Sequence, residues 1–244
     1  MMSAKTITGL LKDYRALLEE LDAWFAACLD RTEPGLIRCG AGCSACCRGL
    51  FDITLLDARL LQEGFRRLPE EVRRAVLSRA RPRLVELAER WPGFGPPYLL
   101  NNLPDEEWTE MPEEDETPCP LLGDDGHCLV YAWRPMTCRL HGLPNIDISG
   151  ESFADSWCSL NFVDRNPLEH PELRWNFRDN FTREILLFRE FTKQLLGYPL
   201  NELDTFIPTA LFIDFERIDW QRVIRQIKRH DRGRPPRDRI LREG

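Results

Sequence analysis

The sequence predicts a mostly α protein, with helices packed around a loop-rich core of clustered cysteines and with little or no sheet. Residues 7–28 and 171–196 place apolar side chains at three- and four-residue steps, which is typical of amphipathic helices. Between these stretches, residues 36–165 hold eight of the nine cysteines and few long apolar runs. The chain of 244 residues, 43% hydrophobic and 30% charged, has the composition of a soluble globular protein with one large domain or two small ones.

Charge and hydropathy exclude several classes of protein. The balance of 40 acidic against 33 basic residues gives a net charge of −7, which argues against a generally basic nucleic-acid binder. No stretch approaches the roughly 18 uncharged apolar residues of a membrane span, and residues 1–14 lack the apolar core of a signal peptide. We therefore expect a cytoplasmic protein that binds neither membrane nor nucleic acid. In that reducing compartment, clustered cysteines are more often metal ligands or redox groups than disulfides.

The N-terminal unit, residues 1–35, is predicted to be one amphipathic helix. Its apolar positions recur with helical spacing, and Pro34 and Gly35 terminate it. Cys28 lies on the apolar face of this helix. We therefore expect Cys28 to be a small buried hydrophobe rather than a metal ligand.

The next predicted helical stretch covers residues 54–90, inside the cysteine-containing unit 36–165. Thr54 or Asp57 is suited to cap its start, and Pro69 suits the first turn of a second helix. Pro82 falls inside the apolar pattern of that second helix. Because proline removes a backbone hydrogen bond, we expect Pro82 to kink or split the helix.

Two charged segments are candidate partner sites. The acidic, proline-rich insertion 91–118 contains eight acids and no base between residues 105 and 116. Residues 222–242 carry nine bases, and the basic tail 231–244 ends the chain. The first interpretation of the acidic loop is a solvated loop, and of the basic segment a solvated or intramolecular role. The alternative is that either one docks a protein partner of opposite charge.

The C-terminal helical region, residues 166–230, is expected to pack on the cysteine unit. Its long helix is predicted over residues 171–196, with Gly197 as the stop. Residues 210–215 form a short apolar run that suits either a strand or a buried turn. A last helix is predicted through residues 220–227.

The cysteines outside the first helix fall into two sets with short spacings. The first set is Cys39-x3-Cys43-x2-Cys46-Cys47, in which Gly40 and Gly42 allow tight turns. The second set is Cys119-x8-Cys128-x9-Cys138, followed by Cys158. Structural zinc and the common iron–sulfur clusters each close with four such ligands. The eight thiols are thus predicted to serve one site with spare thiols, or two sites.

Adjacent cysteines normally direct their side chains differently. Cys46 and Cys47 are therefore easier to explain as ligands of different centres, or as one ligand beside a structural or redox thiol. Only Cys43-x2-Cys46 has the spacing of a zinc-ribbon knuckle, so the irregular spacings favour an iron–sulfur cluster over zinc. His127 and His141 flank two of the cysteines and are second-rank ligand candidates.

A centre with four thiolates carries excess negative charge, about −2 for zinc. A partly buried site needs that charge offset. Arg48, Arg134 and Arg139 lie directly beside cluster cysteines and are the natural candidates, although each is also compatible with an ordinary surface position. Backbone N–H groups of the glycine-containing loop are further candidate donors to sulfur.

Residues 36–160 resemble the bacterial YkgJ-type cysteine-cluster family, described as a zinc- or iron-chelating CxxCxxCC domain. The match consists of the Cys39–Cys47 loop, Cys119, the string CLVYAWRPMTCR at residues 128–139, and Cys158. The resemblance implies metal chelation by all eight cysteines, with Tyr131 and the neighbouring arginines around them. Flagellin lysine methylases carry a similar cysteine set with an iron–sulfur cluster. A resemblance of Cys39-x3-Cys43-x2-Cys46 to radical S-adenosylmethionine enzymes is weaker, because Ala45 replaces the usual aromatic residue.

The leading prediction is a cytosolic metal-binding protein in which an iron–sulfur cluster or zinc staples the cysteine loops together. Its ligands are Cys39, Cys43, Cys46, Cys47, Cys119, Cys128, Cys138 and Cys158. One alternative is an iron–sulfur-dependent protein-modifying enzyme of lysine methylase type, or an oxidoreductase, although GxGxxG, P-loop and HExxH motifs are absent from the sequence. Two further alternatives are a thiol redox switch without metal and an adapter protein that a metal stabilises. The sequence leaves open whether the protein is an enzyme.

Overall fold

The computed structural model describes residues 6–40, 42–103 and 115–231, with the backbone alone at 228–231. Its first element is α1 (Ile7–Arg31), in which the predicted apolar face is buried. The hydroxyl of Thr6 caps the helix by accepting a hydrogen bond from the amide of Gly9 at 3.2 Å. Cys28 is fully buried in the core, as predicted for a small hydrophobe.

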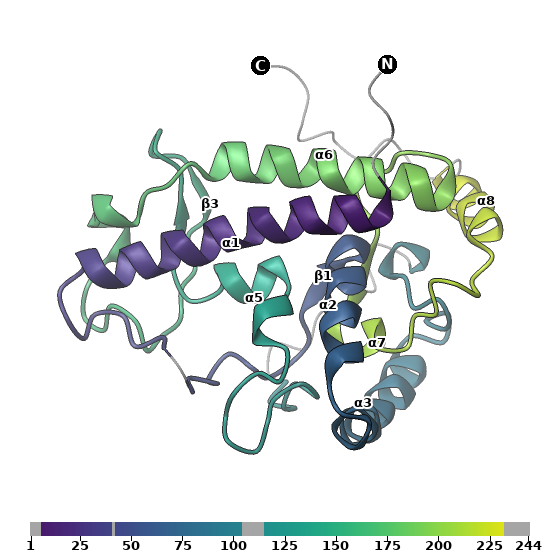
Figure 1. The fold of residues 1–244 in the computed structure, drawn as a ribbon. Helices are drawn as coiled ribbons and strands as arrows, with labels where there is room; N and C mark the ends of the chain where they lie inside the picture. The colour runs from purple at the N-terminus through teal and green to yellow at the C-terminus, as the bar shows by residue number, and fades with distance from the viewer. Residues whose placement is uncertain (1–5, 41, 104–114, 232–244) are drawn as a thin grey trace.

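The long C-terminal helix α6 (Phe177–Leu196) runs antiparallel to α1 (Figure 1). Trp24 meets Phe177 edge to face, with ring centroids 4.8 Å apart, and Arg183 pairs with Glu20. The helix was predicted to begin at Pro171, and this was wrong. Residues 171–173 form the 3-10 helix η4 (Pro171–Leu173), and the amide of Trp175 donates to Ile146 O instead of joining a helix.

Two helices follow the first cysteine loop. In α2 (Leu55–Arg67) the hydroxyl of Thr54 accepts from the amide of Asp57, which confirms Thr54 as the N-cap. Pro69 stands just before α3 (Glu70–Arg90). Pro82 lies inside α3 and does not split it, contrary to one of the two predicted outcomes. The buried side chains of α3 on both sides of the proline hold the helix together by packing; they are Val76, Ala80, Arg83 and Leu87.

Within residues 6–40, 42–103 and 115–231, sheet structure is confined to two short antiparallel pairs, which confirms the mostly α class. β1 (Asp52–Thr54) pairs with β4 (Asp204–Phe206), so the end of the cysteine loop is joined to the C-terminal region. β2 (Asn145–Ile146) pairs with β3 (Ser152–Ala154) between the later cysteines. The remaining helices are α5 (Met136–Leu140), α7 (Ile207–Ala210) and α8 (Trp220–Asp231), with 3-10 helices η1 (Leu100–Asn102), η2 (Tyr131–Trp133) and η3 (Pro167–Glu169).

One hydrophobic core joins α1, α2, α5, α6, α7 and α8. A second, smaller cluster forms where the proline-rich segment folds back, since Trp91 and Phe94 pack on the ring of Phe206. Residues 210–215 form a buried turn after α7 rather than a strand. Residues 104–114 and 232–244 lie outside the described residues. Most of the acidic loop 105–116 and nearly all of the basic tail 231–244 are therefore not described.

Candidate metal centre

The first cysteine loop consists of consecutive tight turns. The amide of Cys43 donates to Gly40 O at 3.1 Å, and the amide of Cys47 donates to Ser44 O at 3.0 Å. Gly42 has φ +80°, a left-handed conformation that L side chains rarely adopt. The tight turns expected from the two glycines are present; that they gather the four thiols at one point stays a prediction.

The second cysteine stretch lies directly against the first. The amide of Cys119 donates to Cys47 O at 2.9 Å, and the amide of Gly49 donates to Thr117 O at 2.9 Å. A short antiparallel bridge between Arg48 and Pro118 joins the same two segments. The two cysteine stretches, which are far apart in sequence, therefore meet in space.

Cys128 and Cys138 reach this junction through a hairpin and a short helix. The hairpin pairs Leu122 with Cys128, and the amide of Leu129 donates to Leu121 O at 2.9 Å. Pro135 precedes α5, a position that suits its fixed φ angle, and α5 carries Cys138. Burial raises the pKa of the Cys138 thiol well above its ordinary value.

Cys39 and Cys158 are held together by Asn161, a residue that sequence reasoning missed. The side-chain amide of Asn161 donates to Cys39 Sγ at 3.2 Å and to Gly142 O at 2.6 Å. The amide of Cys158 in turn donates to Gly142 O at 3.3 Å. Asn161 is 1% exposed, so its polar contacts replace water at this point.

All nine cysteines are free thiols. Burial raises the pKa of Cys119 to about 11, and it also raises the pKa values of Cys39 and Cys128. The pKa of Cys47 is instead lowered, because the Cys46 thiol donates a hydrogen bond to it. Since a metal takes thiolates, a metal ion bound by these thiols would displace their protons.

The thiols interact in two neighbourhoods. The thiols that act electrostatically on Cys39, raising its pKa, are those of Cys43, Cys46 and Cys158. On Cys47, the raising electrostatic effect comes from the thiols of Cys119, Cys128 and Cys138, and it is outweighed by the hydrogen bond from Cys46. Across the described ranges 6–40, 42–103 and 115–231, no three His, Cys, Asp or Glu side chains stand close enough together to hold a metal ion. A metal ion bound here would therefore require the cysteine loops to move so that the sulfurs come closer together.

Two of the three predicted charge-compensating arginines lie beside the thiols. Arg134 and Arg139 both bind the carboxylate of Asp22 on α1, and their positive charge partly offsets the burial that raises the pKa of Cys128. The Arg139 side chain is 1% exposed and also donates to the carbonyl of Arg134. Arg48 instead pairs with Glu116 at 3.7 Å on the surface.

The remaining candidates lie at the edge of the cluster. Tyr131 is 60% exposed and presents its ring to the guanidinium of Arg134, 3.8 Å from its centroid. His127 is exposed and packs beside Gly42 of the first loop. His141 is exposed by its accessible surface and meets the ring of Phe51 edge to face, and partial desolvation lowers its pKa. His127, Tyr131 and His141 thus lie near cysteine-bearing segments.

A cavity rich in carboxyl groups adjoins the cysteine helix α5. It has a volume of about 210 Å³, and its lining includes Asp57, Glu184 and Asp204 from three different elements. Tyr14 donates to Asp57 at 2.8 Å, and the amide of Met136 donates to the same oxygen at 3.0 Å. Burial raises the pKa of Asp57 to about 6 and that of Glu184 to about 7. The sequence carries no pattern that indicates this cavity.

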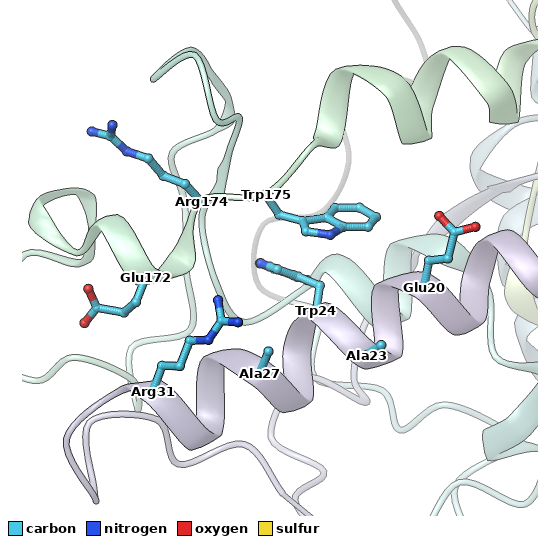
Figure 2. A pocket seen from close by; sticks show the side chains of 8 residues that line it. All are labelled: Glu20, Ala23, Trp24, Ala27, Arg31, Glu172, Arg174 and Trp175. Atoms are coloured by element: carbon cyan, nitrogen blue, oxygen red, sulfur yellow. The ribbon is translucent and has the colours of Figure 1, made fainter.

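A second hollow of about 360 Å³ lies between α1 and residues 172–175 (Figure 2). Trp24 and Trp175 stack there with centroids 6.3 Å apart, and Figure 2 shows Arg31 and Glu172 beside them. The two carboxylates that line this hollow form pairs with basic side chains, Glu20 with Arg183 and Glu172 with His170. None of its lining residues is a cysteine, so the hollow is separate from the candidate metal centre.

Comparisons of the chain with models of known protein families, with curated proteins and with solved structures give no match. The resemblance to the YkgJ-type family therefore remains a prediction that rests on the cysteines and the residue 128–139 string themselves. Within the part of the chain that the structure describes, no helix combines the length and the apolar character needed to cross a bilayer.

Proposed function

We propose that this chain is a metal-binding protein whose eight clustered cysteines hold an iron–sulfur cluster, the preferred cofactor, or zinc. The observation that carries the proposal is the junction of the two cysteine stretches, made by the hydrogen bond from the amide of Cys119 to Cys47 O. Cysteines that served only as core residues would resemble Cys28, which is fully buried on one helix face. Of the clustered cysteines, Cys43 is instead exposed and the other seven are half-buried.

The chemistry of the donor set fits such a cofactor. Sulfur ligands select iron–sulfur clusters and zinc, and both are bound as thiolates. The guanidinium groups of Arg134 and Arg139 supply positive charge next to the sulfurs, which offsets the charge of a thiolate centre. When bound, the group would supply a covalent link between loops that have little hydrophobic core of their own. Eight unpaired thiols also suit a reducing cytoplasm, where we place the protein.

The decisive experiment is anaerobic purification followed by elemental analysis and visible absorption. We expect stoichiometric iron with absorption near 400 nm, or stoichiometric zinc in a colourless protein. The Cys28→Ala variant is the matched control and retains the metal, because Cys28 lies outside the cluster. Purified protein without either metal, which takes up neither Zn²⁺ nor iron and sulfide on reconstitution, would contradict the proposal.

Metal removal gives a second measurement. Chelation is expected to increase hydrogen exchange at residues 36–50 and 115–160, because the metal holds these loops together. Exchange in α1 and α6 should change little, since their contacts are made in the hydrophobic core. A uniform change in hydrogen exchange across the chain, or no change at the loops, would argue against a metal that holds the loops together. Docking of a partner by residues 105–116 or 222–242 stays a separate prediction.

A further inference from the structure

The hollow between α1 and residues 172–175 is a concave surface to which no cysteine contributes (Figure 2). Its volume of about 360 Å³ lies within the range of about 300–1,000 Å³ that is typical of small-molecule sites. On one side it is lined by a single stripe of α1, which runs along positions 20, 23, 24, 27 and 31. On the other side its wall runs from η4 toward the start of α6.

Both walls of the hollow are fixed by contacts within the chain. The indole N–H of Trp24 donates to Leu173 O at 2.9 Å, which ties α1 to η4. The amide of Trp175 donates to Ile146 O at 3.0 Å, which holds the opposite wall against β2. Both indole rings also meet the buried ring of Phe177 edge to face. The hollow is therefore preformed, and a preformed site spends little free energy on ordering when it binds a ligand.

Aromatic and small side chains form the middle of the hollow. The rings of Trp24 and Trp175 stack with centroids 6.3 Å apart, and Trp175 is half-buried, so part of its ring is accessible. Ala23 and Ala27 lie one turn apart on α1 beside these rings, and their methyl groups leave space that longer side chains would fill. A flat ring of a ligand fits this surface, because aromatic rings pack on one another in offset or edge-on contact.

The hydrogen-bond donors around the hollow are unpaired. Within the part of the chain that the structure describes, the guanidinium groups of Arg31 and Arg174 and the indole N–H of Trp175 have no hydrogen-bond or ion-pair partner. The two lining carboxylates, in contrast, are already paired with basic side chains. Figure 2 shows Arg31 reaching from α1 toward the opposite wall, whereas Arg174 extends outward from the rim. This arrangement favours a ligand that brings a negatively charged acceptor to Arg31.

The charges around the hollow favour a monoanion over a phosphate. The planar guanidinium of Arg31 matches the two oxygens of a carboxylate. A phosphate monoester carries about −1.5 to −2 charge at pH 7. Glu20 and Glu172 line the same hollow, and their carboxylates would repel that larger charge more strongly.

We propose that this hollow binds a small aromatic carboxylate, whose ring packs on Trp175 over Ala23 and Ala27 and whose carboxylate pairs with Arg31. The proposal is independent of the proposed metal-binding function, because the lining contains no cysteine. Failure of either proposal therefore leaves the other intact.

The test is calorimetric titration of the full-length chain with naphthoate, with the indole N–H signals followed by NMR. We expect a dissociation constant below about 1 mM and a shift of the Trp175 signal, which the Trp175→Phe variant assigns. Neutral naphthamide should bind at least about tenfold more weakly, because it brings no charge to Arg31. Naphthyl phosphate should also bind more weakly than naphthoate, because of the two carboxylates at the hollow.

Two variants locate the binding site. Arg31→Gln should weaken naphthoate binding at least about tenfold and leave naphthamide binding unchanged, a difference that a general loss of folding would not produce. Ala27→Leu fills the hollow and should abolish binding of both compounds. The matched control is Arg81→Gln, which changes an exposed arginine of α3 outside the hollow and should bind naphthoate as the wild type does.

Four outcomes would overturn the proposal. They are no binding of naphthoate at about 10 mM, equal affinity for naphthoate and naphthamide, tighter binding of naphthyl phosphate than of naphthoate, and wild-type affinity for naphthoate in both Arg31→Gln and Ala27→Leu. If Ala27→Leu fails to fold, Arg31→Gln still decides, since Arg31 is exposed at the last turn of α1.

Discussion

Asn161 contacts the sulfur of Cys39, a backbone carbonyl and a backbone amide at once. Its side-chain NH₂ donates to Cys39 Sγ and Gly142 O, while its Oδ1 accepts from the amide of Arg38 at 2.8 Å. Donors to a metal-bound sulfur stabilise its negative charge, and such outer contacts are worth about 10–100-fold in metal affinity. A single neutral side chain is thus expected to tune one centre without binding its metal.

The Asn161→Asp variant tests this role with almost no change of shape. The new carboxylate keeps the acceptor for Arg38 but places an oxygen, instead of a donor, against Cys39 Sγ. We expect the affinity for Zn²⁺ to fall about 10–100-fold. Competition with a chelator measures the affinity, and urea unfolding of the metal-free chain measures the stability of the fold. A loss of stability that accounts for the whole loss of affinity would mean that Asn161 acts only through the fold.

Asp22 is the single carboxylate that serves two arginines. Arg134 and Arg139 both bind it, and their side chains are 12% and 1% exposed. Asp22→Asn leaves the buried guanidinium of Arg139 without its countercharge, so we expect a loss of about 2 kcal/mol in the free energy of unfolding. The expected loss of stability is small because the Asp22 side chain is 38% exposed, so water screens its charge.

The matched control for this pair is Glu20→Gln, which removes the exposed pair with Arg183. Both of those side chains are more than 40% exposed, so its loss should cost less than about 1 kcal/mol. Urea unfolding of both variants gives the comparison. A loss for Asp22→Asn that is no larger than for Glu20→Gln would contradict the importance of burial here.

At the scale of elements, the contact between α2 and η2 is made at a glycine. A Cβ atom at Gly64 would stand 2.6 Å from Cβ and Cγ of Trp133, closer than real Cβ contacts. Gly→Ala inside a helix normally stabilises it by about 0.5–1 kcal/mol. At Gly64 we expect the reverse, a loss of about 1–3 kcal/mol from overpacking, measured by thermal unfolding.

Two further variants isolate the cause. Gly95→Ala adds the same methyl group where a Cβ atom meets nothing within 4 Å, so its effect should be small. Combining Gly64→Ala with Trp133→Gly removes both the Cβ atom and the ring that the new methyl group meets, and the double variant should lose less than the sum of the two single changes. Additive losses would show that the side chain of Trp133 is not the obstacle.

The periodic spacing of apolar residues predicted the helices that bury one face. It failed where a helix end is set by hydrogen bonds to backbone far away in the sequence. α1 followed its apolar spacing, and Gly197 ended α6 in the left-handed conformation that the sequence suggested. The start of α6 was misplaced because Trp175 pairs with Ile146, a contact that local spacing does not encode. The cysteines were evident as a set, but Asn161 carries no pattern, since its partner Cys39 lies 122 residues away.

At the scale of the molecule, the carboxyl-rich cavity makes stability depend on pH. Glu184 faces Asp57, Asp204 and Asp52 around this cavity, and burial raises its pKa from 4.5 to about 7. Because the folded state binds this proton more tightly than the unfolded state, its contribution falls as the pH rises from about 4.5 to 7. Above pH 7 the folded chain carries the full cost of an ionised, desolvated carboxylate.

Glu184→Gln removes that cost. We expect the variant to be more stable than the wild type at pH 8, by on the order of 1–3 kcal/mol, and to differ little near pH 4.5. Asp57 and Asp204 remain, so the pH dependence of the variant should be shallower but not absent. Unfolding free energies at the two pH values measure it, and parallel pH profiles for the two proteins would contradict the assignment.

The contact between Asn161 and Cys39 also has a consequence for synthesis of the chain. Translation at roughly 5–20 residues per second needs about 6–25 seconds to add the intervening 122 residues. Throughout that interval the first loop of the nascent chain exposes thiols that have not yet met Asn161. We therefore expect the unfinished polypeptide to be more sensitive to oxidants than the complete chain.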